Sequence, residues 1–281
     1  MSYRLQVPWT DSPFFQDLCD GSLGLSKEEL QEAREYHELG YITMDLNLDD
    51  EFIERLKVAV NAAPKAQEEG YHYSDSPRVF EAWRTSHEVI GLATNPKVLS
   101  KLRMLYQREP IPFQTINFIK GSNQPLHSDV IHFHSVPERF MCGVWVALED
   151  MDCFNGTLSY VPGSHKLPVY DFQSLGLPKA EYGKQFKSYA IYEEFIKDLV
   201  VARGLKVKNA YIKKGQAILW NGNLIHGGSK VLDPERTRWS QATHYFFKGC
   251  EHYYSPMFSS PSAGEYSEKD LSTKDILNWK I

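Results

Sequence analysis

The sequence has few cysteines and no cysteine motif. Its four cysteines, Cys19, Cys142, Cys153 and Cys250, are widely separated, and no two of them form a C-x-x-C pair. This spacing argues against a disulfide framework and against a cysteine-based zinc site. It is typical of reduced thiols in a cytoplasmic protein.

Basic character and long apolar runs are also lacking. The chain has 31 Lys and Arg against 36 Asp and Glu, a formal net charge of −5, so a nucleic-acid partner is not expected. No uninterrupted apolar run approaches the roughly 20 residues that span a bilayer. The first residues, Met1-Ser2-Tyr3-Arg4-Leu5, lack the apolar segment of a signal peptide. We therefore expect a cytoplasmic protein with no membrane partner, and composition leaves its oligomeric state open.

Hydrophobic residues make up 42% of the 281-residue chain and aromatic residues 13%, enough for one large core. The N-terminal part has helical patterns. Ser26-Lys27-Glu28-Glu29 is a capping box, and it predicts a helix that ends near Gly40. Further helices are predicted over 52–62, 88–94, 97–106 and 192–202, and short strands over 41–44 and 79–83.

The hydrophobic pattern changes to a period of two after residue 112. Strands are predicted over 113–119, 140–148, 157–161, 210–220 and 239–248. Helices followed by short strands predict a mainly β fold with flanking helices, a β-sandwich or jelly roll. We expect a single domain, 1–281. Its N-terminal helical support is 25–110, and its barrel core is 111–165 together with 210–250. An insertion, 166–209, is a possible lid, and 251–281 is a C-terminal tail.

A His-x-Asp pair stands near the start of the strand-rich part. In an extended chain, residues i and i+2 point to the same face, so His127 and Asp129 would point to one place. The predicted strand at 216–220 leads to His226. If the two segments are neighbours, two imidazoles and one carboxylate meet, which is the ligand set of non-haem Fe(II) oxygenases.

A second metal motif competes with the first. His132-x-His134-x-x-x-Glu138 is similar to the first metal motif of a cupin, although Leu126 stands where that motif has its leading glycine. On this interpretation the chain is a cupin-type metalloenzyme that does not use 2-oxoglutarate. Alternatively, His132 and His134 line the mouth of the active site and contact substrate, or they are solvated.

Several segments together resemble the phytanoyl-CoA dioxygenase family of Fe(II)- and 2-oxoglutarate-dependent oxygenases. The resemblance covers roughly residues 28–250, and the region 166–210 contributes least to it. The segments occur in the family's order (Gln124-Pro125-Leu126-His127-Ser128-Asp129; Asn155-Gly156-Thr157-Leu158; Val161-Pro162-Gly163-Ser164-His165; Lys214-Gly215-Gln216-Ala217; His226-Gly227-Gly228; Arg238).

The resemblance implies a double-stranded β-helix, which is a jelly roll or cupin-like barrel, with His127, Asp129 and His226 as iron ligands. It implies that Arg238, rather than Arg236, binds the C5 carboxylate of 2-oxoglutarate through its planar guanidinium. The positions implied to line the co-substrate pocket are Trp145 and Thr157.

One position departs from the family pattern. Some relatives carry serine two residues after the distal histidine, where it helps to hold 2-oxoglutarate, and here the residue is Gly228. We expect the missing donor to be Ser240 on the following strand. The carboxylate at Asp129 fills the place that chloride takes in halogenating relatives, so the resemblance implies hydroxylation or another oxidation.

The expected function is O2-dependent hydroxylation of a small metabolite, with 2-oxoglutarate converted to succinate. A non-catalytic binding module on the same fold is an alternative, which the complete ligand set and Arg238 disfavour. No basic cluster suggests the phosphates of a CoA thioester. Four aromatic residues of the insertion form either a lid or a packing face, and we favour the lid (Tyr182, Tyr189, Tyr192 and Phe195). His244 is interpreted as a core histidine with a backbone partner.

Overall fold

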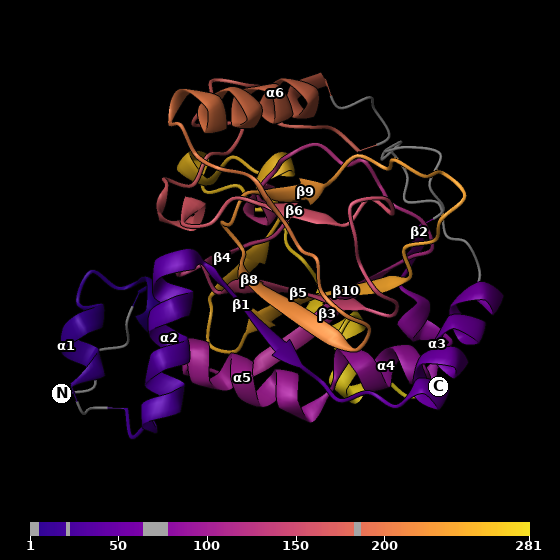
Figure 1. Cartoon of the computed structure of the whole chain (residues 1–281). Helices are drawn as coiled ribbons and strands as arrows, with labels where there is room; N and C mark the ends of the chain where they lie inside the picture. The colour runs from indigo at the N-terminus through magenta and orange to yellow at the C-terminus, as the bar shows by residue number, and fades with distance from the viewer. Residues whose placement is uncertain (1–5, 21–22, 64–77, 183–186) are drawn as a thin grey trace.

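The computed structural model describes residues 6–20, 23–63, 78–182 and 187–281 (Figure 1). Its N-terminal helices begin and end at the predicted signals. The Ser26 hydroxyl accepts from the Glu29 amide, the Glu29 carboxylate accepts from the Ser26 amide, and Gly40 ends the helix with a φ of 79°. The helices are α1 Phe15–Cys19, α2 Lys27–Leu39, α3 Asp50–Ala62, α4 His87–Ala93, α5 Pro96–Tyr106 and α6 Lys187–Ala202.

The strands form one large sheet and two small ones, and all of their recorded pairings are antiparallel. The large sheet has the order β1-β8-β5-β10-β3-β2, and the small sheets are β7-β6-β9 and β11-β4. The bounds are β1 Tyr41–Asp45, β2 Arg78–Phe80, β3 Pro110–Phe118, β4 His134–Val136, β5 Met141–Ala147, β6 Leu158–Tyr160, β7 Lys208–Asn209, β8 Gln216–Asn221, β9 His226–Gly228, β10 Ser240–Phe247 and β11 His252–Tyr254.

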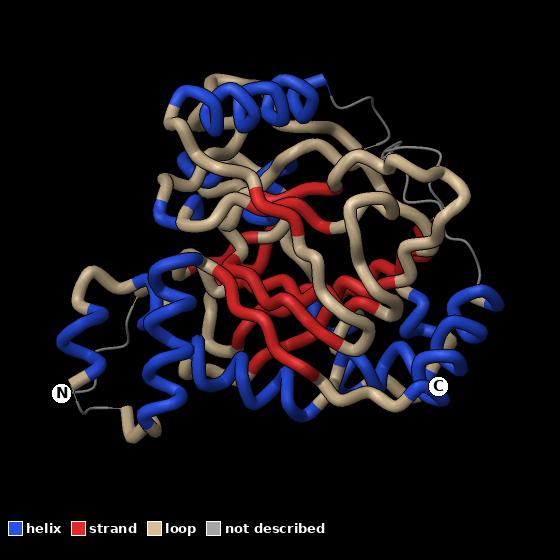
Figure 2. Tube along the Cα trace, viewed as in Figure 1, coloured by secondary structure: helices blue, strands red, loops and turns tan. Residues whose placement is uncertain are grey.

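The central strands of the large sheet are buried on both faces. On β5, Val144 and Val146 belong to the core that is shared with α2 to α5, whereas Trp145 and Ala147 belong to a second core inside the barrel. Figure 1 accordingly shows α5 and α4 below the large sheet, and Figure 2 shows helices on that side of the strands and mainly loops on the other side. The predicted fold, a jelly roll with flanking helices, is confirmed.

Some predicted boundaries are wrong. The segment 79–83 is a strand only to Phe80, because Ala82–Arg84 turns into a 3-10 helix after Glu81 adopts a φ of 52°. Strand β8 begins at Gln216 rather than at residue 210. Over the residues that the structure describes, no helix combines the length and the apolar character needed to cross a bilayer.

Candidate active site

His127 and His226 lie side by side in an isolated antiparallel bridge. Each backbone N–H donates to the carbonyl oxygen of the other residue at 2.9 Å. Directly paired residues project their side chains to the same face of a ladder, and the two ring centroids are 4.5 Å apart. The two segments are therefore neighbours, although the preceding strands β3 and β8 are separated by β5 and β10 in the large sheet.

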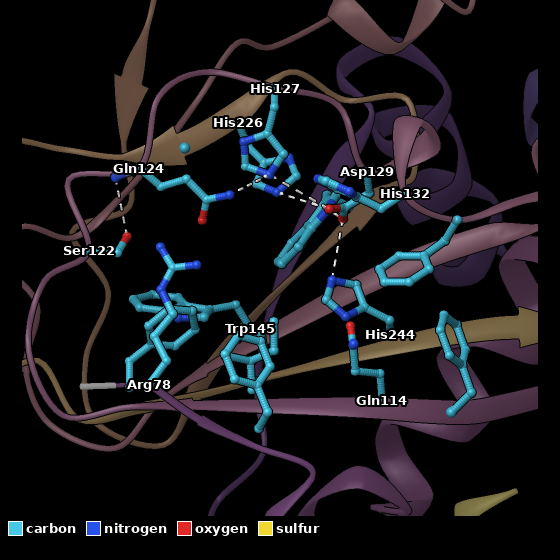
Figure 3. Close-up of a pocket in the computed structure, with 18 of the residues that line it drawn as sticks. Arg78, Gln114, Ser122, Gln124, His127, Asp129, His132, Trp145, His226 and His244 are labelled. Atoms are coloured by element: carbon cyan, nitrogen blue, oxygen red, sulfur yellow. Dashed lines mark hydrogen bonds and ion pairs between the residues drawn. The ribbon is translucent and has the colours of Figure 1, made fainter. Parts of the chain in front are cut away.

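Asp129 completes the cluster from a turn rather than from a strand. Ser128 is extended, and Asp129 begins the 3-10 helix Asp129–Ile131. The Asp129 Oδ1 lies 3.8 Å from Nε2 of His127 and 3.6 Å from Nε2 of His226 (Figure 3). All three side chains are buried, and one ligand atom from each lies within 4.8 Å of the others. Within the described residues, this is the one group of three potential metal ligands with such geometry.

Backbone carbonyls orient the two imidazoles. The Nδ1 of His127 lies 2.9 Å from the Pro125 oxygen, and the Nδ1 of His226 lies 2.9 Å from the Leu224 oxygen. Because a carbonyl only accepts, each Nδ1 carries the proton and each Nε2 presents its lone pair toward Asp129. Metal-binding histidines are commonly fixed in this way.

The charge states also suit a metal ion. Burial, and next the neighbouring His226, lower the pKa of His127 to about 3. Burial opposes ionisation of Asp129, but the imidazoles of His226, His244 and His127 together hold the pKa of this carboxyl below its ordinary value. Metals bind neutral imidazole and ionised carboxylate, so this donor set fits Fe(II) with further coordination positions open.

Arg238 brings a positive charge into the same cavity. Its side chain is buried, and its guanidinium carbon lies 4.6 Å from the ring centroid of Phe118 and 5.6 Å from that of Trp145. Its Nε has no hydrogen-bond partner among the described residues. Burial lowers the Arg238 pKa to about 9, with Arg78 contributing, so the side chain remains charged at neutral pH. A buried cation with an unused donor is suited to bind a carboxylate.

The two neighbouring arginines occupy different environments. Arg236 lies on the surface, and its Nη2 is 3.1 Å from the Asp152 carboxylate. Arg238 lines the cavity together with Trp145 and with the cluster of His127, Asp129 and His226. The geometry therefore favours Arg238 over Arg236 for binding a ligand in the cavity.

Two predicted co-substrate residues lie elsewhere. The hydroxyl of Thr157 donates to the Ala210 carbonyl at 2.7 Å, and that of Ser240 donates to the Arg238 carbonyl at 3.3 Å. Neither residue lines the cavity. The expected pocket role is therefore not supported for either side chain, because both hydroxyls are turned toward backbone.

The hydroxyl of Ser122, rather than that of Thr157 or Ser240, lies beside Gly228. A Cβ at Gly228 would lie 2.6 Å from the Oγ of Ser122, so the Ser122 side chain occupies the volume that a larger residue at 228 would need. Ser122 lines the cavity, and Figure 3 shows it near Gln124 and Arg78. The structure thus places Ser122, rather than Ser240, where a hydroxyl donor can face a bound molecule.

The alternative metal motif is not assembled. His132 lines the cavity, and its Nε2 lies 3.0 Å from the Tyr189 hydroxyl. His134 lies outside the lining, buried on β4 with its Nδ1 3.1 Å from the Tyr254 hydroxyl, and Glu138 is exposed. The sequence prediction of a substrate contact therefore matches the position of His132 but not that of His134.

Two buried histidines outside the cavity predict a pH dependence of stability. Burial lowers the pKa values of His134 and His165 to about 4. Their contribution to the free energy of unfolding is complete above the unfolded-state pKa of about 6.5. It is lost as the pH falls toward 4, because in this range the unfolded chain binds protons at these histidines and the folded chain does not. Each histidine should contribute about 2 kcal/mol to this loss, so urea unfolding of the metal-free protein should give a free energy of unfolding about 4 kcal/mol lower at pH 5 than at pH 7. A His134→Gln, His165→Gln variant should lose less, and an unchanged loss would contradict this assignment.

His244 is a site residue that the sequence interpretation missed. Its Nε2 lies 3.6 Å from the Asp129 Oδ2 rather than beside a backbone group. Figure 3 shows its ring below the carboxylate, on the cavity wall. The alternation of side chains along β10 could have predicted this position, because residue 244 lies on the same face as Ala242, which belongs to the inner core.

The insertion supports the metal-binding segment from outside. Tyr189 and Tyr192 of α6 are buried against Ile131 and Val161, and the Tyr192 hydroxyl accepts from the Ser128 amide at 3.2 Å. Figure 1 shows α6 beyond β6 and β9, away from the large sheet. Of the described insertion residues, only Tyr182 lines the cavity, where it stacks on Phe258 at 4.0 Å. Packing is therefore the better supported role for α6.

Comparisons with known proteins agree with this architecture. A family model described as phytanoyl-CoA dioxygenase (PhyH) matches residues 25–238. The peroxisomal phytanoyl-CoA dioxygenase of Bos taurus is 24% identical over 223 residues, a match that covers 76% of this chain and 59% of that protein. The chain therefore spans less than two thirds of the length of this relative.

Solved structures share the fold. The epimerase SnoN in complex with Fe3+, alpha ketoglutarate and nogalamycin RO has a TM-score of 0.63 at 18% identity, covering 86% of this chain and 95% of that chain. EctD from S. alaskensis with 2-oxoglutarate and 5-hydroxyectoine has a TM-score of 0.61 at 21% identity. This match covers 83% of this chain and 80% of that chain. At these identities, the likeness establishes the fold alone.

Proposed function

The chain belongs to the phytanoyl-CoA dioxygenase family of Fe(II)- and 2-oxoglutarate-dependent oxygenases, and we propose that it hydroxylates a small molecule. One observation carries the proposal: the cluster of His127, Asp129 and His226 shares a cavity of about 220 Å³ with the buried cation of Arg238. The cluster offers a metal site, and the arginine offers a carboxylate site.

In this proposal, His127 and His226 bind Fe(II) through Nε2, and Asp129 binds it through Oδ1. The Pro125 and Leu224 carbonyls hold the imidazoles in the tautomer that leaves Nε2 free. Three protein ligands leave positions for 2-oxoglutarate and O2.

Arg238 binds the distal carboxylate of 2-oxoglutarate. Its guanidinium lies against the rings of Phe118 and Trp145, and these contacts restrict the directions of its donors before the ligand arrives. The Ser122 hydroxyl is the candidate second donor, because it lines the same cavity. Both groups act by orienting the co-substrate relative to the metal ligands.

Bound Fe(II) and 2-oxoglutarate supply the oxidation of a substrate C–H bond by O2, with release of succinate and CO2. The protein excludes water from this chemistry with apolar walls that include Phe113, Phe133 and Phe258. The complexes of EctD and SnoN with small molecules support a small-molecule substrate in the same fold.

An isotope experiment distinguishes hydroxylation from other outcomes. Substrate, 2-oxoglutarate and O2 give hydroxylated product, succinate and CO2, so reaction under 18O2 should place one labelled atom in the product and one in succinate. A panel of small metabolites that includes ectoine is first screened for stimulation of succinate release. A product that has gained no oxygen atom, formed with consumption of 2-oxoglutarate, would refute hydroxylation.

A further inference from the structure

The Asp129 carboxylate is held on its far side by an indole. Its Oδ2 accepts a hydrogen bond from Nε1 of Trp220 at 2.8 Å, and both residues are buried. The Nε2 of His244 lies 3.6 Å from the same oxygen. We infer that Trp220 is a positioning residue for the metal site and sets how Asp129 binds the ion. This inference rests on the proposed role of Asp129 as a ligand.

The two oxygens of Asp129 have different surroundings. Oδ1 faces the Nε2 atoms of His127 and His226, at 3.8 and 3.6 Å, whereas Oδ2 faces the Trp220 N–H. A hydrogen bond to a charged acceptor in a buried site is strong and directional. The indole thus keeps Oδ2 turned away, and Oδ1 is the oxygen available to a metal.

The backbone of β5 makes room for this contact. Trp220 pairs with Gly143 across β8 and β5. A Cβ at Gly143 would lie 2.2 Å from Cε2 of the indole, so the ring lies across the glycine in space that any other residue would fill. The same ring packs against His226, with centroids 4.8 Å apart. One indole therefore contacts two of the three proposed ligands.

The arrangement bears on how many coordination positions stay open. If Asp129 bound through both oxygens, it would take a position that 2-oxoglutarate or O2 needs. Without the Trp220 N–H, Oδ2 loses its 2.8 Å hydrogen bond and keeps only the more distant His244, so the carboxylate can rotate more easily. Loss of a hydrogen bond that orients a ligand typically weakens metal binding about 10- to 100-fold.

The test compares two Trp→Phe variants of the full chain. Trp220→Phe removes the N–H and keeps an aromatic ring. Trp83→Phe is the matched control, because Trp83 is also fully buried and its Nε1 has no hydrogen-bond partner among the described residues. Anaerobic titration should give an Fe(II) dissociation constant about 10- to 100-fold higher for Trp220→Phe and within about twofold of the wild-type value for Trp83→Phe. The visible spectrum of the Co(II)-loaded protein should change in the first variant only, since it reports coordination number.

A second variant keeps the test decisive if Trp220→Phe does not fold. Gly143→Ala retains the indole N–H but displaces the ring, and it should raise the Fe(II) dissociation constant in the same direction. An Fe(II) affinity in Trp220→Phe equal to that of Trp83→Phe, with an unchanged Co(II) spectrum, would overturn the inference. These titrations contain no 2-oxoglutarate, so a wild-type protein that binds Fe(II) without converting 2-oxoglutarate contradicts the proposed function and leaves this comparison valid.

Discussion

Asp129→Ala is expected to raise the Fe(II) dissociation constant at least about 100-fold and to lower 2-oxoglutarate turnover at least about 1,000-fold, or roughly 4 kcal/mol. Asp129 supplies the single carboxylate of the buried cluster. Its removal leaves two imidazoles, and neither can supply a negative charge to balance a divalent ion. Titration should use chloride-free buffer, so that no anion takes the vacated position.

His134→Ala is the matching control for Asp129→Ala. His134 is a buried histidine five positions later, it does not line the cavity, and it belongs to the competing cupin-type motif. Its replacement should lower stability but leave the Fe(II) affinity within about threefold of the wild-type value. Loss of iron in His134→Ala together with its retention in Asp129→Ala would favour the cupin-type enzyme.

Arg238→Ala should raise the KM for 2-oxoglutarate about 100-fold, equivalent to about 2.7 kcal/mol, since it removes a buried charge-assisted pair of hydrogen bonds. Arg238→Lys keeps the charge but not the planar fork, so an increase of about tenfold is expected. Affinity for Fe(II) alone should not change, because Arg238 does not contact the cluster in the described hydrogen bonds.

Arg236→Ala provides the control for Arg238→Ala. This arginine is two residues away and forms a surface ion pair with Asp152, a kind of interaction that contributes little. The KM for 2-oxoglutarate should stay within about twofold of the wild-type value. Equal effects of the two substitutions would show that the cavity cation is not the carboxylate site.

Local signals in the sequence predict the scaffold well. The capping box at Ser26 and the helix end at Gly40 depend only on residues close in the sequence, and both are present in α2. The alternating segments become β5 and β10 within about one residue at each end. Such features depend on local propensity and on the side-chain period, which a single sequence displays directly.

Contacts across the barrel explain what the sequence could not give. The partner of Asp129 is Trp220, which is 91 residues away, and its position depends on the absence of a side chain at Gly143. Ser122, rather than Ser240, faces the cavity because a loop folds against Gly228. The helix of the insertion has the expected aromatic residues, but whether they close the cavity or pack behind it depends on where the preceding loop directs them.

Joint binding of Fe(II) and 2-oxoglutarate in this cavity is tested by an anaerobic titration of the metal-free protein with Fe(II) and then with 2-oxoglutarate, followed by visible absorption. We expect a charge-transfer band that appears only when both are present, that is absent in His127→Ala and that needs far more 2-oxoglutarate in Arg238→Ala. A wild-type protein that binds Fe(II) yet develops no band at saturating 2-oxoglutarate would contradict joint binding.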